Sequence, residues 1–90
     1  MYKDITSYSR GDTERKPSVL QNEANGIVFR VHKHIYYGDQ WLLSCKELNV
    51  DKIPLNTDNM EIAKEKGCLK MIELLNRKAE EYKKAVDSFL

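Results

Sequence analysis

Apolar side chains are sparse in the first part of the chain and dense in the rest. Residues 1–25 are mostly polar or charged, and Gly11 and Pro17 interrupt them. Such a segment buries too little apolar surface to offset the entropy lost when its backbone is ordered. We expect residues 1–25 to form an extended or mobile arm outside the hydrophobic core, closed by the turn signal Asn25-Gly26. A short strand or turn where Tyr2, Ile5 and Tyr8 fall is the alternative within this arm. Residues 26–90 should then form the folded domain.

A strand is expected over residues 27–37, where β-branched and aromatic side chains are enriched. Alternation along a strand assigns its side chains to two faces. The inward set is Ile27, Phe29, Val31 and Ile35, and the outward set is Val28, Arg30, His32, His34 and Tyr36. Lys33 breaks the inward set, so we expect a bulge or the end of the strand near this residue.

Two further strands complete the predicted sheet. Gly38-Asp39 is a two-residue hairpin signal, because glycine tolerates the positive φ that tight reverse turns demand. Alternation then divides the return strand, residues 40–47, into an inward set of Trp41, Leu43 and Cys45 and an outward set of Leu42, Ser44 and Lys46. A third strand over residues 52–55 is confined to an edge by Pro54, which has no backbone N–H. The sequence therefore predicts a three-stranded antiparallel sheet.

One long helix is expected from Asp58 to about Ser88. Asp58 and Glu61 resemble a capping box, and only Gly67 interrupts the segment that follows. Glycine inside a helix costs about 1 kcal/mol relative to alanine, so Gly67 indicates a close approach to the sheet. At ~1.5 Å per residue the helix is roughly 45 Å long, whereas a strand of about seven residues spans ~24 Å. We expect an α+β fold of βββα order, in which the end of the helix projects beyond the sheet.

The second half of the expected helix carries a narrow apolar stripe. Its members are spaced by three and four residues in alternation, as in a coiled-coil seam: Ile72, Leu75, Ala79, Tyr82, Val86 and Phe89. Because this part of the helix extends past the sheet, the stripe has no neighbour within the chain. The pattern predicts a protein partner for it, most simply a second copy that forms a homodimer. The alternative is a kink near Asn76 that folds the helix end back over the other edge of the sheet.

Composition and charge narrow the classes of protein that fit this pattern. Hydrophobic residues make up 41% and charged residues 32% of the chain, which is typical of one small globular domain. Lys and Arg number 15 and Asp and Glu 14, and this balance argues against strong non-specific attraction to DNA or to anionic membranes. No apolar run approaches the ~20 residues of a membrane span, and no export signal is found. We expect a cytoplasmic protein without membrane contact, in which Cys45 and Cys68 are reduced, buried thiols.

Few residues in the sequence offer chemistry. His32 and His34 lie on the same predicted strand face, but a zinc site needs at least three protein ligands and the sequence supplies no obvious third. The pattern contains no Gly-rich phosphate loop, nucleophile elbow or pair of acids on one predicted face. We therefore expect no metal, no cofactor and no enzyme activity. A small metal-dependent enzyme around His32 and His34 is the least favoured alternative.

The outward face of the predicted sheet is basic. Five side chains share it without an interleaved acid: Arg30, His32, His34, Tyr36 and Lys46. Cations together with an aromatic ring can contact phosphates and stack on a base. This face is therefore the candidate surface for DNA, RNA or a protein partner, and the simpler interpretation is an ordinary solvated sheet face.

A run of residues in the middle of the chain and the helix after it carry a resemblance. The residues concerned are Trp41-Leu42-Leu43-Ser44-Cys45-Lys46, Pro54-Leu55, Asp58, Ala63-Lys64 and the long amphipathic helix. Over about the last 50 residues, the chain resembles small accessory proteins of bacteriophages and their prophages. The resemblance implies a βββα accessory protein, in a group that includes regulators and inhibitors of host defence. It assigns no functional residues.

These patterns favour a non-catalytic binding protein. We expect a phage-type regulator or inhibitor that acts on a host protein or nucleoprotein complex, for example a defence system. The alternative is a domain that binds DNA or RNA directly through the basic face. Salt dependence separates the two functions, because phosphate contacts release counterions and a protein interface does so far less.

Overall fold

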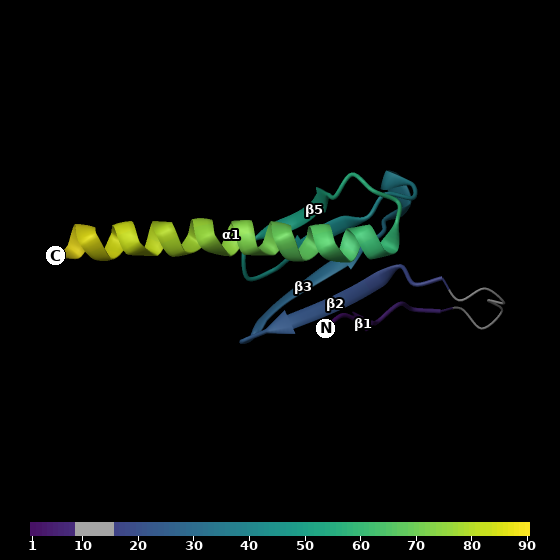
Figure 1. Cartoon of the computed structure of the whole chain (residues 1–90), viewed down its shortest axis with the longest axis horizontal. Helices are drawn as coiled ribbons and strands as arrows, with labels where there is room; N and C mark the ends of the chain where they lie inside the picture. Colours follow the sequence, from purple (N-terminus) through teal and green to yellow (C-terminus); the bar gives the residue numbers. More distant parts are fainter. Residues whose placement is uncertain (9–15) are drawn as a thin grey trace.

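A five-stranded antiparallel sheet and one long helix make up the protein (Figure 1), which a computed structural model describes over residues 1–8 and 16–90. The strands are β1 (Lys3–Asp4), β2 (Val19–Ala24), β3 (Ile27–His32), β4 (Leu42–Cys45) and β5 (Val50–Pro54). They lie in the sheet in their sequence order, so each strand pairs with its neighbours along the chain. The helix α1 (Met60–Phe89) follows β5, and a short 3-10 helix, η1 (Ile35–Tyr37), lies between β3 and β4.

The expected three-stranded sheet is wrong, and the α+β class is confirmed. The additional strands, β1 and β2, come from residues 1–25, where the composition predicts a polar arm. Asn25 and Gly26 have positive φ values of 50° and 81°, as in the tight two-residue turn that joins antiparallel strands. β2 pairs with β3 over its whole length, and its Leu20 is only 4% exposed. One buried side chain and a continuous ladder to β3 hold this strand, although most of its other residues are polar.

The connection between β3 and β4 is longer than the predicted hairpin. β3 ends at His32, and η1 and Gly38 occupy the loop before β4. An end of the strand near Lys33 was one of the two expected outcomes, but the strand over residues 33–37 and the two-residue turn are wrong. Ile35, predicted to point inward, is 87% exposed because the chain has left the sheet before it.

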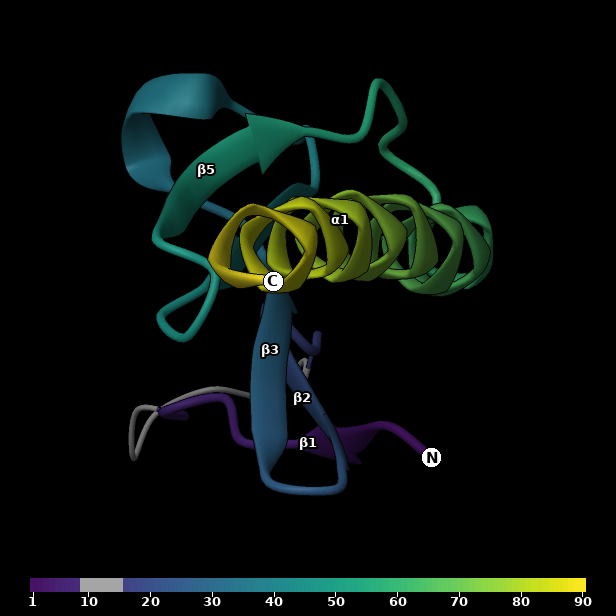
Figure 2. The ribbon, with the colours of Figure 1, turned by 90° about the vertical axis from the view of Figure 1, so that its left-hand side faces the viewer.

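The hydrophobic core lies between α1 and the sheet, as the view along the helix indicates (Figure 2). Most of the inward positions predicted from alternation are buried in and next to β3 and β4, and Ile27 is partly buried. The buried ones are Phe29, Val31, Trp41, Leu43 and Cys45. Leu42 departs from its prediction, because alternation assigns it to the solvent face and yet it is completely buried, with His32 and Pro54 as its register partners. Pro54 lies in an edge strand, as predicted from its missing N–H.

The helix α1 begins at Met60, later than the sequence predicts. Its N-cap is Asn59, whose side-chain oxygen accepts a hydrogen bond from the backbone N–H of Ile62 at 3.0 Å. Asp58 lies before the helix, and its carbonyl oxygen accepts a hydrogen bond from the indole N–H of Trp41 at 3.2 Å. The predicted capping box that starts at Asp58 is therefore wrong, because the asparagine that follows it caps the helix.

Gly67 allows α1 to approach the sheet closely, as expected. A Cβ atom at this position would lie 2.6 Å from Cγ2 of Val31 and 2.9 Å from the hydroxyl of Tyr2. The Tyr2 hydroxyl donates to the backbone carbonyl of Lys64 at 2.8 Å and lies 3.4 Å from Sγ of Cys68. Burial raises the pKa of the Tyr2 hydroxyl. This side chain fastens the beginning of the chain, and with it β1, to the first half of the helix.

The second half of α1 extends beyond the sheet (Figure 1). Every residue from 81 to 90 is exposed, whereas the buried helix residues Ala63, Gly67 and Met71 all lie in the first half. The protein measures 60 × 24 × 20 Å along its principal axes, so the helix determines its length. Over residues 1–8 and 16–90, no helix combines the length and the apolar character that crossing a membrane requires.

Candidate functional site

Arg30 and His32 point away from α1, on the face of the sheet opposite the core. Alternation along β3 puts them there, because their neighbours Phe29 and Val31 are buried toward the helix. Ser44 of β4 is the register partner of Arg30, so its side chain lies on the same face. This face therefore brings a cation of β3 beside a hydroxyl group of β4.

His32, Ser44 and Asp51 form a hydrogen-bonded chain on this face. Nε2 of His32 lies 2.7 Å from Oγ of Ser44, which donates to Oδ1 of Asp51 at 3.2 Å. The backbone N–H of Lys52 donates to the same Oγ at 2.9 Å, and Nδ1 of His32 lies 3.2 Å from the carbonyl oxygen of Lys33. Desolvation lowers the pKa of His32, against the opposing effects of the Lys33 carbonyl and the Asp51 carboxylate. Each nitrogen of the imidazole thus lies within hydrogen-bond distance of a protein oxygen.

The order of these three groups does not fit nucleophilic catalysis. In a catalytic triad the acid accepts a hydrogen bond from the histidine and orients it toward the serine. Here Asp51 accepts a hydrogen bond from Ser44 instead. Its other carboxylate oxygen accepts a hydrogen bond from the Nζ of Lys52 at 2.8 Å. The interaction with Lys52 is the one that most lowers the pKa of Asp51. The chain of hydrogen bonds connects β3, β4 and β5, and its geometry supports a structural role.

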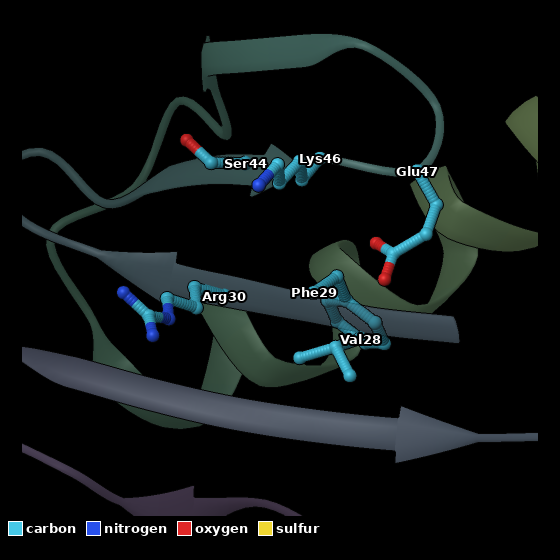
Figure 3. Close-up of a pocket in the computed structure, with 6 residues that line it drawn as sticks. All are labelled: Val28, Phe29, Arg30, Ser44, Lys46 and Glu47. Atoms are coloured by element: carbon cyan, nitrogen blue, oxygen red, sulfur yellow. The ribbon is translucent and has the colours of Figure 1, made fainter. Parts of the chain in front are cut away.

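A hollow of about 330 Å³ opens beside the hydrogen bonds of Ser44, and we call it the sheet-face hollow (Figure 3). Its lining consists of Val28, Phe29, Arg30, Ser44, Lys46 and Glu47. Nε of Arg30 donates to the side-chain oxygen of Gln21 at 3.1 Å. Within the described part of the chain, neither Arg30 nor Lys46 takes part in an ion pair. Glu47 shares the hollow with them, so the expectation of a basic face without an interleaved acid is wrong.

His34 and Tyr36 lie outside the sheet, on the loop that contains η1. His34 is the N-cap of η1, and its Nδ1 accepts a hydrogen bond from the backbone N–H of Tyr36 at 3.2 Å. The imidazole also lies near the rings of Tyr36 and Tyr37, with centroids 5.3 and 5.8 Å away. The end of β3 at His32 is the reason that the structure divides the predicted basic face between the sheet and this loop.

The apolar stripe of α1, which we call the helix stripe, is exposed throughout. All six members face solvent: Ile72, Leu75, Ala79, Tyr82, Val86 and Phe89. The exposed fraction is 66% for Tyr82 and 90% for Phe89. The helix runs straight through Asn76, so the alternative in which its end folds back over the sheet is wrong (Figure 1).

An apolar hollow of about 210 Å³ adjoins the beginning of the helix stripe, and we call it the hairpin hollow. Its lining includes side chains of α1 and of the β2–β3 hairpin: Ala24, Ile27, Phe29, Cys68, Ile72 and Leu75. The hollow and the helix stripe share Ile72 and Leu75, so they form one continuous apolar surface. The part contributed by the hairpin was not predicted, because the sequence pattern places the start of the domain at Asn25-Gly26. The signal was present, since this dipeptide between two extended segments is a strong hairpin signal.

The two cysteines are free and lie at different depths. Cys45 is buried, and desolvation raises the pKa of its thiol, which makes it a poor nucleophile. Cys68 is half-buried and contacts the Tyr2 hydroxyl. Among the residues that the structure describes, no three His, Cys, Asp or Glu side chains are grouped as a metal site would require.

Two surfaces are therefore the candidate functional sites of this protein. One is the sheet-face hollow, with Arg30 and Lys46 on its lining. The other is the helix stripe together with the hairpin hollow. A scan against protein-family models, a search of curated proteins and a search of solved structures each found no match for the chain.

Proposed function

We propose that this chain is a non-catalytic binding protein that acts as a homodimer held together by the helix stripe. The observation that carries the proposal is the exposure of five large apolar side chains along one line of α1: Ile72, Leu75, Tyr82, Val86 and Phe89. Monomeric soluble proteins seldom expose contiguous apolar surface of this kind unless it binds something.

Two unfavourable contributions to the free energy of the single chain support a partner for the helix stripe. Each large apolar side chain that stays in water forgoes on the order of 1.5–3 kcal/mol of burial free energy. A helix end without tertiary packing is also marginally stable in water. A second copy offsets both costs, because it supplies the same stripe and a two-fold axis matches the stripe to itself.

The test is the mass of the protein in solution, measured by light scattering. We expect a dimer of the 10.5 kDa chain. Val86→Asp and Phe89→Asp should each divide it into monomers, because either one buries a carboxylate at the interface. Ser88→Asp is the matched control, since it adds the same charge next to Phe89 but on the other side of the helix, and it should remain dimeric. A monomeric wild-type chain, or equal effects of all three substitutions, would contradict the proposal.

For the action of the dimer, we propose a phage-type regulator or inhibitor in the cytoplasm that binds a host protein or nucleoprotein complex, for example a defence system. The support is the exposed helix stripe, together with the resemblance to phage accessory proteins that the sequence pattern of the second half of the chain led us to expect. Pull-down of the dimer from host lysate, with and without nuclease treatment, distinguishes a protein target from one held through nucleic acid. Binding of no target in either condition would count against this action.

A second candidate function is direct binding of DNA or RNA at the sheet-face hollow. The observation in its favour is that Arg30 and Lys46 both line this hollow and form no ion pair within residues 1–8 and 16–90. Such a group of donors can hold a phosphate. Glu47 on the same lining weakens this attraction, and we therefore rank the function second.

Binding to labelled DNA and RNA at several salt concentrations tests the second candidate. Arg30→Ala with Lys46→Ala should weaken binding and flatten its salt dependence, because fewer counterions are released. Arg77→Ala with Lys84→Ala is the matched control, since it removes the same two residue types from the exposed helix surface. No binding at low salt, or equal losses in both double variants, would eliminate the sheet-face hollow as a nucleic-acid site.

A further inference from the structure

We propose that the second copy docks antiparallel on α1, with the two-fold axis between Glu80 and Glu81. The last turns of each helix then lie along residues 71–80 of the other helix. This inference rests on the proposed homodimer and adds its alignment. Three features of the chain support it: the sizes of the stripe residues, the charges beside the stripe, and the position of the hairpin hollow.

The helix stripe matches itself in this alignment. Ile72 faces Phe89 of the partner subunit, and Leu75 faces Val86 of the partner subunit. Near the axis, Ala79 faces Tyr82 of the partner subunit. The smallest member of the stripe is therefore opposite a large one, which fills the seam. A parallel pair in register would place Ala79 against its own copy and leave a gap in the middle of the seam.

The charges beside the helix stripe also favour the antiparallel alignment. Lys78 and Lys83 lie on opposite sides of the stripe, because Lys78 directly precedes Ala79 and Lys83 directly follows Tyr82. In a parallel pair, residues on opposite sides face each other across the seam. Lys78 would then face Lys83 of the partner subunit, and the two-fold axis would repeat this repulsive contact.

An antiparallel pair removes this repulsion, because residues on the same side of the two stripes face each other. Lys83 then faces Asn76 of the partner subunit, which is uncharged. On the other side of the stripe, Lys78 faces Ala85 of the partner subunit. No pair of like charges therefore meets across the seam in this alignment.

In the antiparallel alignment, the end of the partner's helix lies next to the hairpin hollow. In the antiparallel alignment, Phe89 of the partner subunit reaches Ile72, which lines this hollow together with Ala24 and Ile27 of the β2–β3 hairpin. An aromatic ring that is 90% exposed in the single chain is thus placed over apolar side chains of both helix and sheet. The sheet lies along the first half of α1 (Figure 1), so the antiparallel alignment puts the two sheets toward opposite ends of the paired helices.

Disulfide trapping in glutathione buffer tests the alignment, with Cys68→Ala as the background to remove the accessible native thiol. Asn76→Cys with Lys83→Cys reports on the antiparallel pair, because each new cysteine faces the other one in the partner. Lys78→Cys with Lys83→Cys reports on the parallel pair. Neither pair can close within one helix, because its two positions lie about 7 Å or more apart along the axis. We expect a covalent dimer from the first variant and none from the second.

The other outcomes separate the alignment from the proposed function. A covalent dimer only from the Lys78→Cys and Lys83→Cys variant would overturn the antiparallel alignment and leave the homodimer standing. A dimer by light scattering that neither variant traps would overturn the alignment as well. A monomeric wild-type chain would overturn both.

A second measurement concerns the hairpin hollow. Ala24→Asp should raise the dissociation constant of the dimer by roughly tenfold or more, because the antiparallel partner covers this residue with Phe89. Glu23→Asp, at the neighbouring exposed position of β2, is the control and should leave the constant unchanged. An unchanged dimer in Ala24→Asp would place the partner away from the hollow and contradict the alignment.

Discussion

Gly67 faces Val31 of β3 and the hydroxyl of Tyr2 across the interface between helix and sheet. At an ordinary helix position, alanine is favoured over glycine by about 1 kcal/mol. Here the added methyl group would lie 2.6 Å from Cγ2 of Val31, so the helix or the sheet must shift. Overpacking of this kind costs about 1–3 kcal/mol, and we expect Gly67→Ala to lower the free energy of unfolding by about 1 kcal/mol net, measured by urea denaturation.

The control for this prediction removes the nearer of the two atoms that the methyl group would meet. In a Val31→Ala background, Gly67→Ala should destabilise the protein less, because the contact with Cγ2 of Val31 is gone and only the contact with the Tyr2 hydroxyl opposes the gain in helix propensity. The double-mutant cycle gives the coupling between the two positions. Equal destabilisation in both backgrounds would show that contact with Val31 is not the reason for the glycine.

His32 makes the stability of the fold depend on pH. Its pKa is lowered in the folded protein, chiefly by desolvation. Between this lowered pKa and the ordinary value of about 6.5, the unfolded chain binds more protons than the folded one, so stability rises with pH in that window. We expect the free energy of unfolding to fall as the pH is lowered from 7 to below 6, and His32→Gln to reduce this slope. Urea denaturation at several pH values measures both slopes, and identical slopes would contradict the assignment to His32.

At the scale of elements, β2 is the strand that the sequence pattern did not predict. Its polar residues hide the buried position of Leu20, and its stability comes from pairing with β3 rather than from its own composition. The long helix and the inward positions of β3 and β4 were predictable, because their apolar periodicity is strong. β1, with two residues, and η1 offer no periodicity at all. Pairing with a neighbouring strand therefore decides what the composition of a segment cannot.

The candidate functional site was likewise predictable from the sequence only in part. Alternation was enough to place Arg30 on the outward face, and spacing was enough to find the helix stripe. The hydrogen-bonded chain through Ser44 and Asp51 could not be predicted, because it depends on the register of β4 with β5. That register shifts between Leu43 and Cys45, where an irregularity interrupts the ladder.

A substitution in β2 tests whether this strand belongs to the core. Leu20→Ala should lower the free energy of unfolding by about 2–5 kcal/mol, because it leaves a cavity beside the buried side chains of β3. Glu23→Ala on the same strand is the control, and it should change stability little because its side chain is exposed. Thermal or urea unfolding measures both. A small effect of Leu20→Ala would mean that β2 is a loose arm, as the composition of residues 1–25 predicts.

At the scale of the whole molecule, the proposed dimer would couple folding to association. If the helix stripe is buried only in the dimer, mass action makes the dimer more stable at higher concentration. We expect the thermal unfolding midpoint to rise over roughly a hundredfold increase in protein concentration. In Phe89→Asp the midpoint should be independent of concentration. Scanning calorimetry measures this, and a constant midpoint in the wild-type chain would contradict coupled folding and association.

The sequential order of the strands also has a consequence for how the chain folds. Each strand pairs with its neighbour in the chain, so the sheet can grow outward from one hairpin without closing a long loop first. The tight turn at Asn25-Gly26 makes the β2–β3 hairpin the natural place for this growth to start. Gly26→Ala, which strains a position with a φ of 81°, should then slow refolding by about as much as it destabilises the protein. Stopped-flow fluorescence of Trp41, the single tryptophan, follows the rate, and an effect confined to unfolding would place the hairpin late in the folding reaction.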